Sequence, residues 1–318
     1  MSSDSLVLAP ADIHPESAAL AAALARQDWP ACRAVLTQPS PGARSWLIAT
    51  GAERTGGGEF LAGVLVADPD DHTAAVMLAA HQVWRAWEAR SAATAEHVTE
   101  QGYAMFHRWL VKAERLLVET AARAPGDATV WTQRLITARG LQLGLPEVRR
   151  RYARLAAVAP HHLPGQYQLL QSLCPKWGGT WEQAYAFARE ATAAAPAGSP
   201  TGMLIPMVHL ERWLDLKDAR GDAAGDYLRG AEVREELTAA ADRSVWHPDF
   251  AREPGWVRTL STFAMAFSLA GDRPAAARAF TELGSFASAM PWEYAVGPVT
   301  ATIRRHRSRA LAHAAATR

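Results

Sequence analysis

The chain has 318 residues, with 33 Lys and Arg against 32 Asp and Glu, which gives a formal net charge of +1 at pH 7. Because positive and negative charges nearly cancel, the chain creates no long-range electrostatic field that would attract nucleic acid or an anionic membrane. We therefore expect neither as a partner. Hydrophobic residues make up 49% of the sequence, and Gly and Pro are used at near-average frequency, so the chain can bury a full core and is not of the disordered class.

The sequence predicts a cytoplasmic protein without disulfides. Its two cysteines, Cys32 and Cys174, lie far apart, so we expect two free thiols rather than a disulfide framework. The first ten residues contain Asp4 and no Lys or Arg, unlike the basic start of a signal peptide. The longest apolar stretches, 60–67 and 263–270, are too short to cross a bilayer.

Helix is expected almost everywhere, because alanine is abundant and apolar residues recur at intervals of three and four. Proline and aspartate pairs such as Asp68-Pro69 mark where one helix ends and the next is capped. The helices expected in the first part of the chain cover 15–26, 28–37, 43–54, a stretch ending near 67, 72–93 and 98–123.

Helix breaks recur at a nearly constant spacing in the middle of the chain. Pro125, Pro160 and Pro196 each follow an alanine, and they lie 35 and 36 residues apart. A period near 34 residues with two helices per unit is typical of tetratricopeptide (TPR) repeats. The breaks therefore predict a helical repeat array.

Small residues support this prediction in part. Ala264, Gly271 and Ala276 precede Phe280 at the spacing at which such a repeat places three small residues and one large residue. The 129–160 unit fits poorly, so the repeats are degenerate. We expect an all-α fold, an irregular TPR-like right-handed superhelix of stacked antiparallel helix pairs. Residues 1–67 would form a helical N-terminal cap, and residues 68–318 the array.

The segment 174–183, CPKWGGTWEQ, predicts a tight corner between two helices. Thr180 and Gln183 have the spacing of a capping box, which starts the second helix. One of the two glycines should adopt positive φ, since a turn directly after a bulky residue requires a conformation that other residues resist. Trp177 should then fold back onto the neighbouring helices.

Five motifs of the chain resemble an uncharacterised bacterial family of TPR-like proteins, over roughly residues 80–215. They are Trp87-Glu88-Ala89-Arg90, Phe106 through Ala113, Pro175 through Thr180, Phe187-Ala188-Arg189 and His209-Leu210-Glu211. The most specific of these motifs is the Pro-Lys-Trp-Gly-Gly corner. The family usually has glycine where this chain has Ser91 and serine where it has Thr180. The resemblance implies an α-helical repeat fold and carries no activity.

One helix face is a candidate metal site. Glu96, Glu100, Tyr103, His107 and Glu114 are spaced to lie along one face of the 98–123 helix and the residues before it. No second helix offers the Glu-x-x-His that a di-iron site requires. We therefore expect no metal and no cofactor, a partly buried, hydrogen-bonded His107 and solvated glutamates. No catalytic set of Ser, His and Asp or of Cys and His is recognisable by spacing.

Tryptophans and nearby charges are the candidate binding residues. Trp84 and Trp87 either pack in the core and between repeats or line a binding surface. Arg90 could then clamp an anionic group such as a carboxylate. The candidate residues are Trp84, Trp87, Arg90, His107, Lys176, Trp177, His209 and Glu211.

Two functions remain open at this point. The first is a non-enzymatic interaction scaffold that binds a protein or peptide partner in the concave face of the array. The alternative is an enzyme or small-molecule-binding protein with a pocket near Trp87, Arg90, His107 and Lys176.

Overall fold

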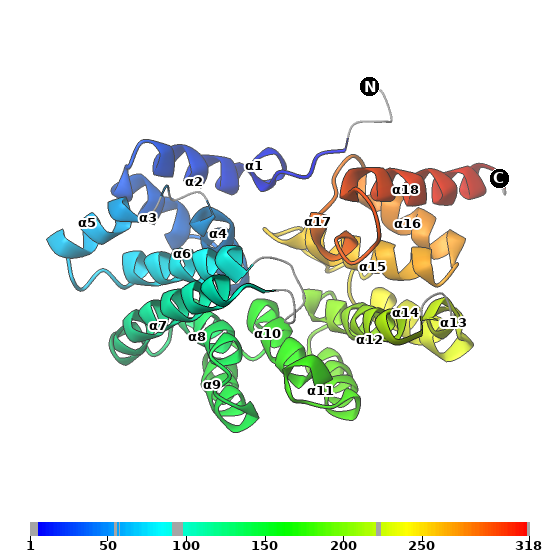
Figure 1. Cartoon of the computed structure of the whole chain (residues 1–318). Coiled ribbons are helices and arrows are strands. Elements are labelled where there is room, and N and C mark those ends of the chain that lie inside the picture. The colour runs from blue at the N-terminus through cyan, green and yellow to red at the C-terminus, as the bar shows by residue number, and fades with distance from the viewer. Residues whose placement is uncertain (1–5, 54–55, 57, 91–97, 221–223, 317–318) are drawn as a thin grey trace. The chain divides into compact units, whose positions relative to one another are not determined.

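The computed structural model describes residues 6–53, 56, 58–90, 98–220 and 224–316. Within these residues the fold is all-α, as predicted (Figure 1). The only β pairing among them is a single parallel bridge between Val7 and Phe286. The contacts divide the chain into two compact units, one formed by residues 14–179 and the other by residues 1–13 together with 180–318.

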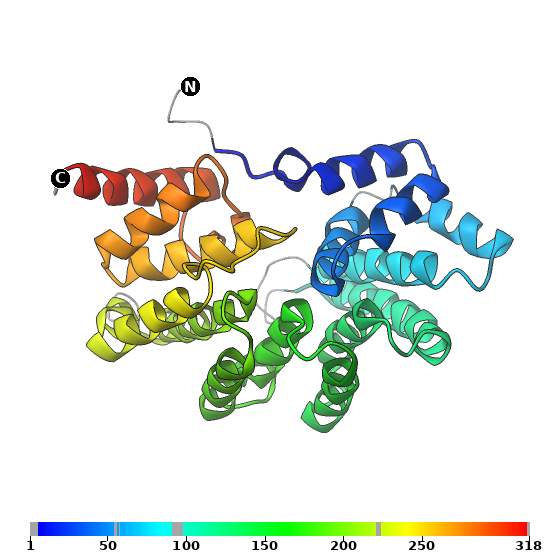
Figure 2. The same ribbon diagram turned by 180° about the vertical axis from the view of Figure 1, so that it is seen from behind.

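The 14–179 unit is built almost entirely from helices. They are α2 (Pro15–Ala25), α3 (Trp29–Thr37), α4 (Pro41–Ala52), α5 (Glu59–Ala67), α6 (His72–Arg90), α7 (Glu100–Arg123), α8 (Ala128–Gly140), α9 (Leu145–Val158), α10 (Leu163–Leu173) and the 3-10 turn η2 (Pro175–Trp177). From α6 to α10 each helix packs against the next, and α6 and α7 lie side by side in both ribbon views (Figures 1 and 2).

Capping residues set most of these helix starts. Asp28 accepts a hydrogen bond from the backbone N–H of Ala31 and begins α3, as expected. Thr99 caps α7, which therefore starts at Glu100 rather than at residue 98. The helix expected to reach residue 93 is described to Arg90; residues 91–93, including Ser91, lie outside the described part.

The core between α6, α7 and α8 positions the aromatic residues discussed below. Val83, Phe106 and Leu110 are buried there, and Trp87 packs against them. A Cβ atom on Gly140 would lie 2.4 Å from a methyl carbon of Leu110, so glycine lets α8 approach α7 closely.

The second unit contains the remaining helices. They are α1 (Pro10–Ile13), α11 (Trp181–Ala194), the 3-10 turn η3 (Pro200–Met203), α12 (Leu204–Arg220), α13 (Ala224–Arg229), α14 (Ala231–Arg243), α15 (Trp256–Leu269), α16 (Arg273–Leu283), α17 (Ala289–Trp292) and α18 (Val299–Ala316). Phe263 and Phe267 of α15 and Phe280 of α16 are fully buried and form the centre of its core. In the N-terminal segment Val7 donates to the carbonyl of Ser285 and accepts from the N–H of Ala287, at 2.9 and 3.0 Å.

The corner at η2 confirms the turn prediction. Gly178 has φ of 90°, in the left-handed region that favours glycine. A Cβ on Gly179 would lie 2.0 Å from the carbonyl oxygen of Leu173, so no side chain fits there without moving the backbone. The hydroxyl of Thr180 accepts from the N–H of Gln183 and caps α11.

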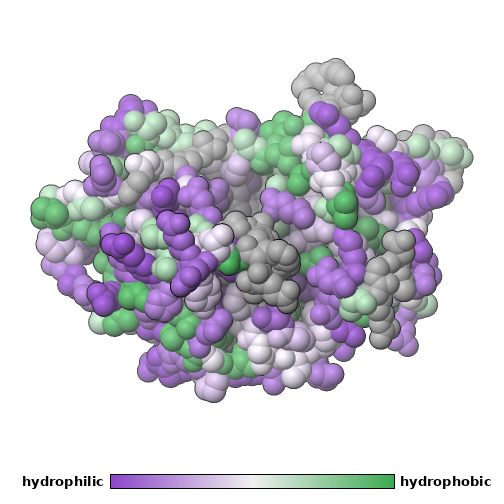
Figure 3. Space-filling model, in the orientation of Figure 1, coloured by the Kyte–Doolittle hydropathy of each residue, from purple (hydrophilic) through white to green (hydrophobic). Residues whose placement is uncertain are grey.

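Cys32 and Cys174 are buried free thiols, as expected. None of the described helices is both long and apolar enough to cross a membrane. Hydrophilic and hydrophobic residues are interspersed over the face that Figure 3 draws. The expected cap over residues 1–67 and array over residues 68–318 stay a prediction.

Candidate functional site

The corner brings two tryptophans from distant parts of the sequence together. Trp87 lies near the C-terminal end of α6 and Trp177 at the end of η2. Their ring centroids are 6.0 Å apart with an interplanar angle of 83°, an edge-to-face contact. Trp87 makes a second such contact with Phe106 of α7, at 5.0 Å. Trp177 therefore folds back onto a neighbouring helix as predicted, but it remains half-buried.

Two arginines lie against these rings. The guanidinium carbon of Arg139, from the end of α8, is 5.6 Å from the ring centroid of Trp87 and 5.3 Å from that of Trp177. Arg90 lies 5.7 Å from Trp87. All three distances are within the range of cation–π attraction. We call Trp87, Arg90, Arg139 and Trp177 the Trp87–Trp177 cluster.

The orientation of Arg139 is fixed by α10. Its Nη1 donates to the side-chain oxygen Oε1 of Gln168 at 2.8 Å. An arginine held by hydrogen bonds to Gln168 and by two ring contacts loses little further side-chain entropy when it binds a ligand. The arrangement is preorganised to present a guanidinium group beside two aromatic surfaces.

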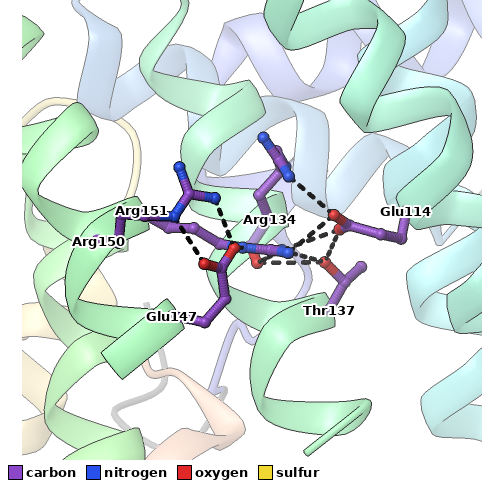
Figure 4. Close-up of polar contacts among 6 residues, drawn as sticks. All are labelled: Glu114, Arg134, Thr137, Glu147, Arg150 and Arg151. Carbon is purple, nitrogen blue, oxygen red and sulfur yellow. Dashed lines mark hydrogen bonds and ion pairs between the residues drawn. The ribbon is translucent and has the colours of Figure 1, made fainter. Parts of the chain in front are cut away.

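A buried ion network fixes the helix that carries Arg139 (Figure 4). Arg151 of α9 donates through Nη1 and Nη2 to the two carboxylate oxygens of Glu114 of α7, both at 2.9 Å. Arg134 of α8 donates to the same carboxylate at 2.9 Å, and the hydroxyl of Thr137 donates to it at 2.5 Å. We call these residues, together with Glu147 and Arg150, the Glu114–Arg151 network.

The network is completed on α9 itself. Glu147 accepts two hydrogen bonds from Arg150 and one from Nε of Arg151, all at 2.7 Å. The Arg150 hydrogen bonds, helped by Arg151, hold the pKa of Glu147 at about 2 although burial opposes this. The network joins α7, α8 and α9, and α8 holds Arg139 in place.

His209 and Glu211 belong to a different set of contacts, in the unit that contains residues 180–318. Both side chains are buried on α12. His209 is hydrogen-bonded through Nδ1 to the hydroxyl of Tyr227 at 2.6 Å and through Nε2 to Glu236 at 3.0 Å. Glu211 accepts from the hydroxyl of Tyr294 at 2.7 Å.

Burial and hydrogen bonding both act on the groups around His209. Burial raises the pKa of Glu236, but hydrogen bonds from His209 and Arg189 outweigh it and hold that pKa at about 2. Burial also raises the pKa of Tyr185 to about 12, and the hydroxyl of Tyr185 is hydrogen-bonded to that of Tyr227. The set is an internal hydrogen-bonded chain between α11, α12, α13 and α14.

The prediction for His107 was wrong. We expected a partly buried, hydrogen-bonded histidine, and its side chain is exposed, because Phe106 and Leu110 occupy the buried face of α7. The prediction that Glu114 is solvated was also wrong, since its carboxylate binds Arg134 and Arg151. Glu96 lies outside the described residues.

The two other candidate residues are placed differently. Trp84 is half-buried, with its ring 5.6 Å from that of His81 and 5.9 Å from the guanidinium of Arg85. Lys176 is exposed on η2, next to Trp177.

Sequence reasoning missed Arg139. Nothing local distinguishes it from the other arginines of the chain, because its role comes from contacts with residues 52 positions before it and 38 after it. Over the part of the chain that the structure describes, no His, Cys, Asp and Glu side chains form a group that could hold a metal ion.

Comparison with known proteins finds no match: no family model, no curated protein and no solved structure matches the chain.

Proposed function

We propose that the chain is a non-enzymatic scaffold that binds a protein or peptide partner, with the Trp87–Trp177 cluster as the principal contact. The proposal includes the TPR-like right-handed superhelix, whose concave face would receive the partner. The succession of packed helices from α6 to α10 supports it. The resemblance to TPR-like proteins is part of the same proposal.

The observation that carries the proposal is the half-buried pair of tryptophan rings with Arg139 against both. Tryptophan and arginine dominate the binding energy of protein interfaces when they sit in well-packed surroundings. Here the rings are held by Phe106 and the guanidinium by Gln168, so their positions are set before a partner arrives.

The alternative, an enzyme or small-molecule site near Trp87, Arg90, His107 and Lys176, stays a prediction. Of these four, Trp87 and Arg90 contact each other directly. The exposed His107 adds no buried acid or base to them.

Selection from a displayed library of random peptides tests the proposal. The native protein should enrich a peptide motif, and Trp177→Ala should lose binding to the enriched peptides. Trp109→Ala is the matched control, because Trp109 is a half-buried tryptophan of α7 with its own cation contacts, Arg85 and Lys112. Failure to enrich any motif, or equal binding by the native protein and Trp177→Ala, would reject the Trp87–Trp177 cluster as a peptide-binding surface.

A further inference from the structure

We propose that α18 carries a second interaction surface, on the unit that does not hold the Trp87–Trp177 cluster, which binds a short acidic peptide segment of a partner protein. The surface consists of Arg304, Arg305 and Arg309, which we call the Arg304–Arg309 patch. This inference goes beyond the function proposed above and does not depend on it. It follows from the exposure of the three arginines, from the sign of the charges around them and from the length of the patch.

The Arg304–Arg309 patch lies on the solvent face of a helix that is anchored by its other face. Ile303 and Ala310 are buried, and α18 packs against α16, beside which it lies in both ribbon views (Figures 1 and 2). The side chains of Arg304, Arg305 and Arg309 are exposed. Because residues four apart on a helix share a face, the three guanidinium groups are presented together from a fixed backbone.

The end of the chain carries charge of only one sign. Residues 294–318 contain five arginines and no Asp or Glu. Among the described residues, no ion pair joins the Arg304–Arg309 patch to an acid. Outside the described residues, this unit contains two acids, Asp4 and Asp222, and one arginine, Arg318. These add one negative charge to three positive charges, so the patch keeps a net positive charge.

The helix itself does not require these arginines. Cations stabilise the last turn of a helix, but His313 is the only basic residue in the last turn of α18. Arg305 and Arg309 lie four residues apart, a like-charge pair that destabilises a helix. The sequence of α18 contains no acid that would offset this repulsion. An anion bound between the two arginines removes it, so binding should stabilise the helix.

His306 reports the positive potential of the patch. Its ring lies 5.3 Å from that of the buried Trp292. Burial, and then the charges of Arg305 and Arg309, lower the pKa of His306 from 6.5 to about 4. An anion held by these two arginines cancels part of their effect and raises the pKa of His306. The histidine therefore offers a readout of binding at this place in the chain.

The surrounding charges limit the length of the ligand. The rest of the unit, residues 1–13 and 180–293, contains 18 acidic and 11 basic residues. Residues 304–309 cover about 7.5 Å of helix, close to the Debye length of about 8 Å at physiological salt. Beyond the patch, a nucleic acid or an anionic bilayer meets a unit with an excess of acids, which repels it. A peptide with a few neighbouring carboxylates fits within the patch, and the planar fork of arginine matches a carboxylate.

The probe that tests this is a peptide of four glutamates with both ends blocked, compared with the equivalent peptide of four glutamines, which has the same size and no charge. Binding to the full chain is followed at about 0.15 M salt through the imidazole signal of His306 in NMR spectra, assigned with His306→Gln. The glutamate peptide should shift this signal in a saturable way and raise the pKa of His306. The glutamine peptide should do neither.

Replacement of two arginines isolates the patch. Arg305→Gln combined with Arg309→Gln should weaken binding of the glutamate peptide about tenfold, because two exposed charge contacts are lost. Arg229→Gln combined with Arg234→Gln is the matched control, since both are exposed arginines on helices of the same unit and the net charge changes equally. This control should bind like the native protein. Circular dichroism of each variant shows whether it is folded.

Ser308→Glu tests the patch without removing an arginine. Ser308 is exposed and lies four residues after Arg304 and three after Arg305, so a carboxylate at this position pairs with them within the helix. The variant should bind the glutamate peptide more weakly and should show a raised pKa of His306 before any peptide is added. Ser308→Gln is its uncharged control and should bind like the native protein.

Equal binding of the two peptides, or full affinity in a folded protein with Arg305→Gln and Arg309→Gln, would overturn the inference. So would a single-stranded oligonucleotide, or vesicles that contain phosphatidylserine, if either binds at least as tightly as the glutamate peptide and depends on the same two arginines. In that case the patch serves a nucleic acid or a membrane.

Trp177→Ala separates this inference from the proposed function. It should lose the peptides enriched from the library and should still bind the glutamate peptide with native affinity. A loss of both would show that the glutamate peptide binds at the Trp87–Trp177 cluster and would overturn the inference. Absence of any enriched motif rejects the proposed function and leaves the Arg304–Arg309 patch to be decided by the glutamate peptide.

Discussion

At the scale of single residues, Arg151 is an arginine with a side chain only 3% exposed. Replacing it with alanine leaves the Glu114 carboxylate without its bidentate partner in a low-dielectric interior. We expect Arg151→Ala to lower the free energy of unfolding by about 3–5 kcal/mol, the usual cost of breaking a buried ion pair from one side. Urea denaturation measures this change.

Arg150→Ala provides the comparison for Arg151→Ala. Arg150 binds the same Glu147, but its side chain is 56% exposed, and exposed pairs contribute about 0–1 kcal/mol. Similar losses in the two variants would show that the Glu114–Arg151 network does not depend on its buried member.

The burial of His162 predicts that the free energy of unfolding depends on pH. Burial lowers its pKa from 6.5 to about 4, with a small opposing effect of Asp127, so the folded protein holds it neutral while its Nε2 bonds to the hydroxyl of Ser45. The unfolded chain binds a proton below pH 6.5, and the folded chain binds it only below about pH 4. The contribution of His162 to the free energy of unfolding is therefore fully present above pH 6.5 and is lost as the pH falls from 6.5 to about 4.

His162→Gln tests the assignment, because glutamine keeps a polar side chain but does not titrate. Between pH 7 and pH 4 the native protein should lose about 3 kcal/mol more unfolding free energy than the variant, the equivalent of the pKa difference. Identical losses in both proteins would show that His162 does not carry this dependence.

At the scale of the element, the η2 corner depends on Gly179. A Cβ atom added there would meet the backbone carbonyl of Leu173 at 2.0 Å, and backbone cannot move aside as a flexible side chain does. We expect Gly179→Ala to lower the free energy of unfolding by about 1–3 kcal/mol through local strain. Gly42→Ala is the control, because a Cβ there meets no atom within 4 Å. It should be neutral or stabilise α4 by up to ~1 kcal/mol. Thermal melts compare the two variants.

The elements themselves were largely predictable from the sequence, because their signals are local. Asp28 and Thr180 cap the helices that follow them, and Gly178 adopts the positive φ that its corner requires. The contacts of Glu114 were not predictable. Its partner Arg151 lies 37 residues away on α9, and a helical pattern reports which face a residue occupies but not which distant charge meets it.

The candidate site was predictable in part for the same reason. The tryptophans and Arg90 were found because they are large or charged residues near a helix end and a marked corner. His107 was misplaced because the spacing of polar residues on α7 does not show where the buried face, with Phe106 and Leu110, ends. Arg139 could not be found from the sequence, because its role depends on the packing of α8 against both α6 and α10.

At the scale of the whole molecule, the chain divides after Gly179. Residues 14–179 form a unit with its own buried core and its own ion network, so we expect a fragment of these residues to fold alone. The expressed fragment should be helical by circular dichroism and should unfold cooperatively. A fragment that is unfolded, or that melts without a transition, would show that this unit needs the rest of the chain.

The bridge at Val7 has a consequence for the order of events on the ribosome. Residues 6–9 leave the ribosome before the 14–179 unit does, but the partners of Val7, Ser285 and Ala287, are synthesised some 280 residues later. The 14–179 unit can thus be complete while the segment before it still waits for its partners. Deleting residues 6–9 should leave the folding of that unit unchanged and should increase hydrogen exchange in the 285–287 segment. In effect, residues 6–9 are made before the 14–179 unit and are placed after it.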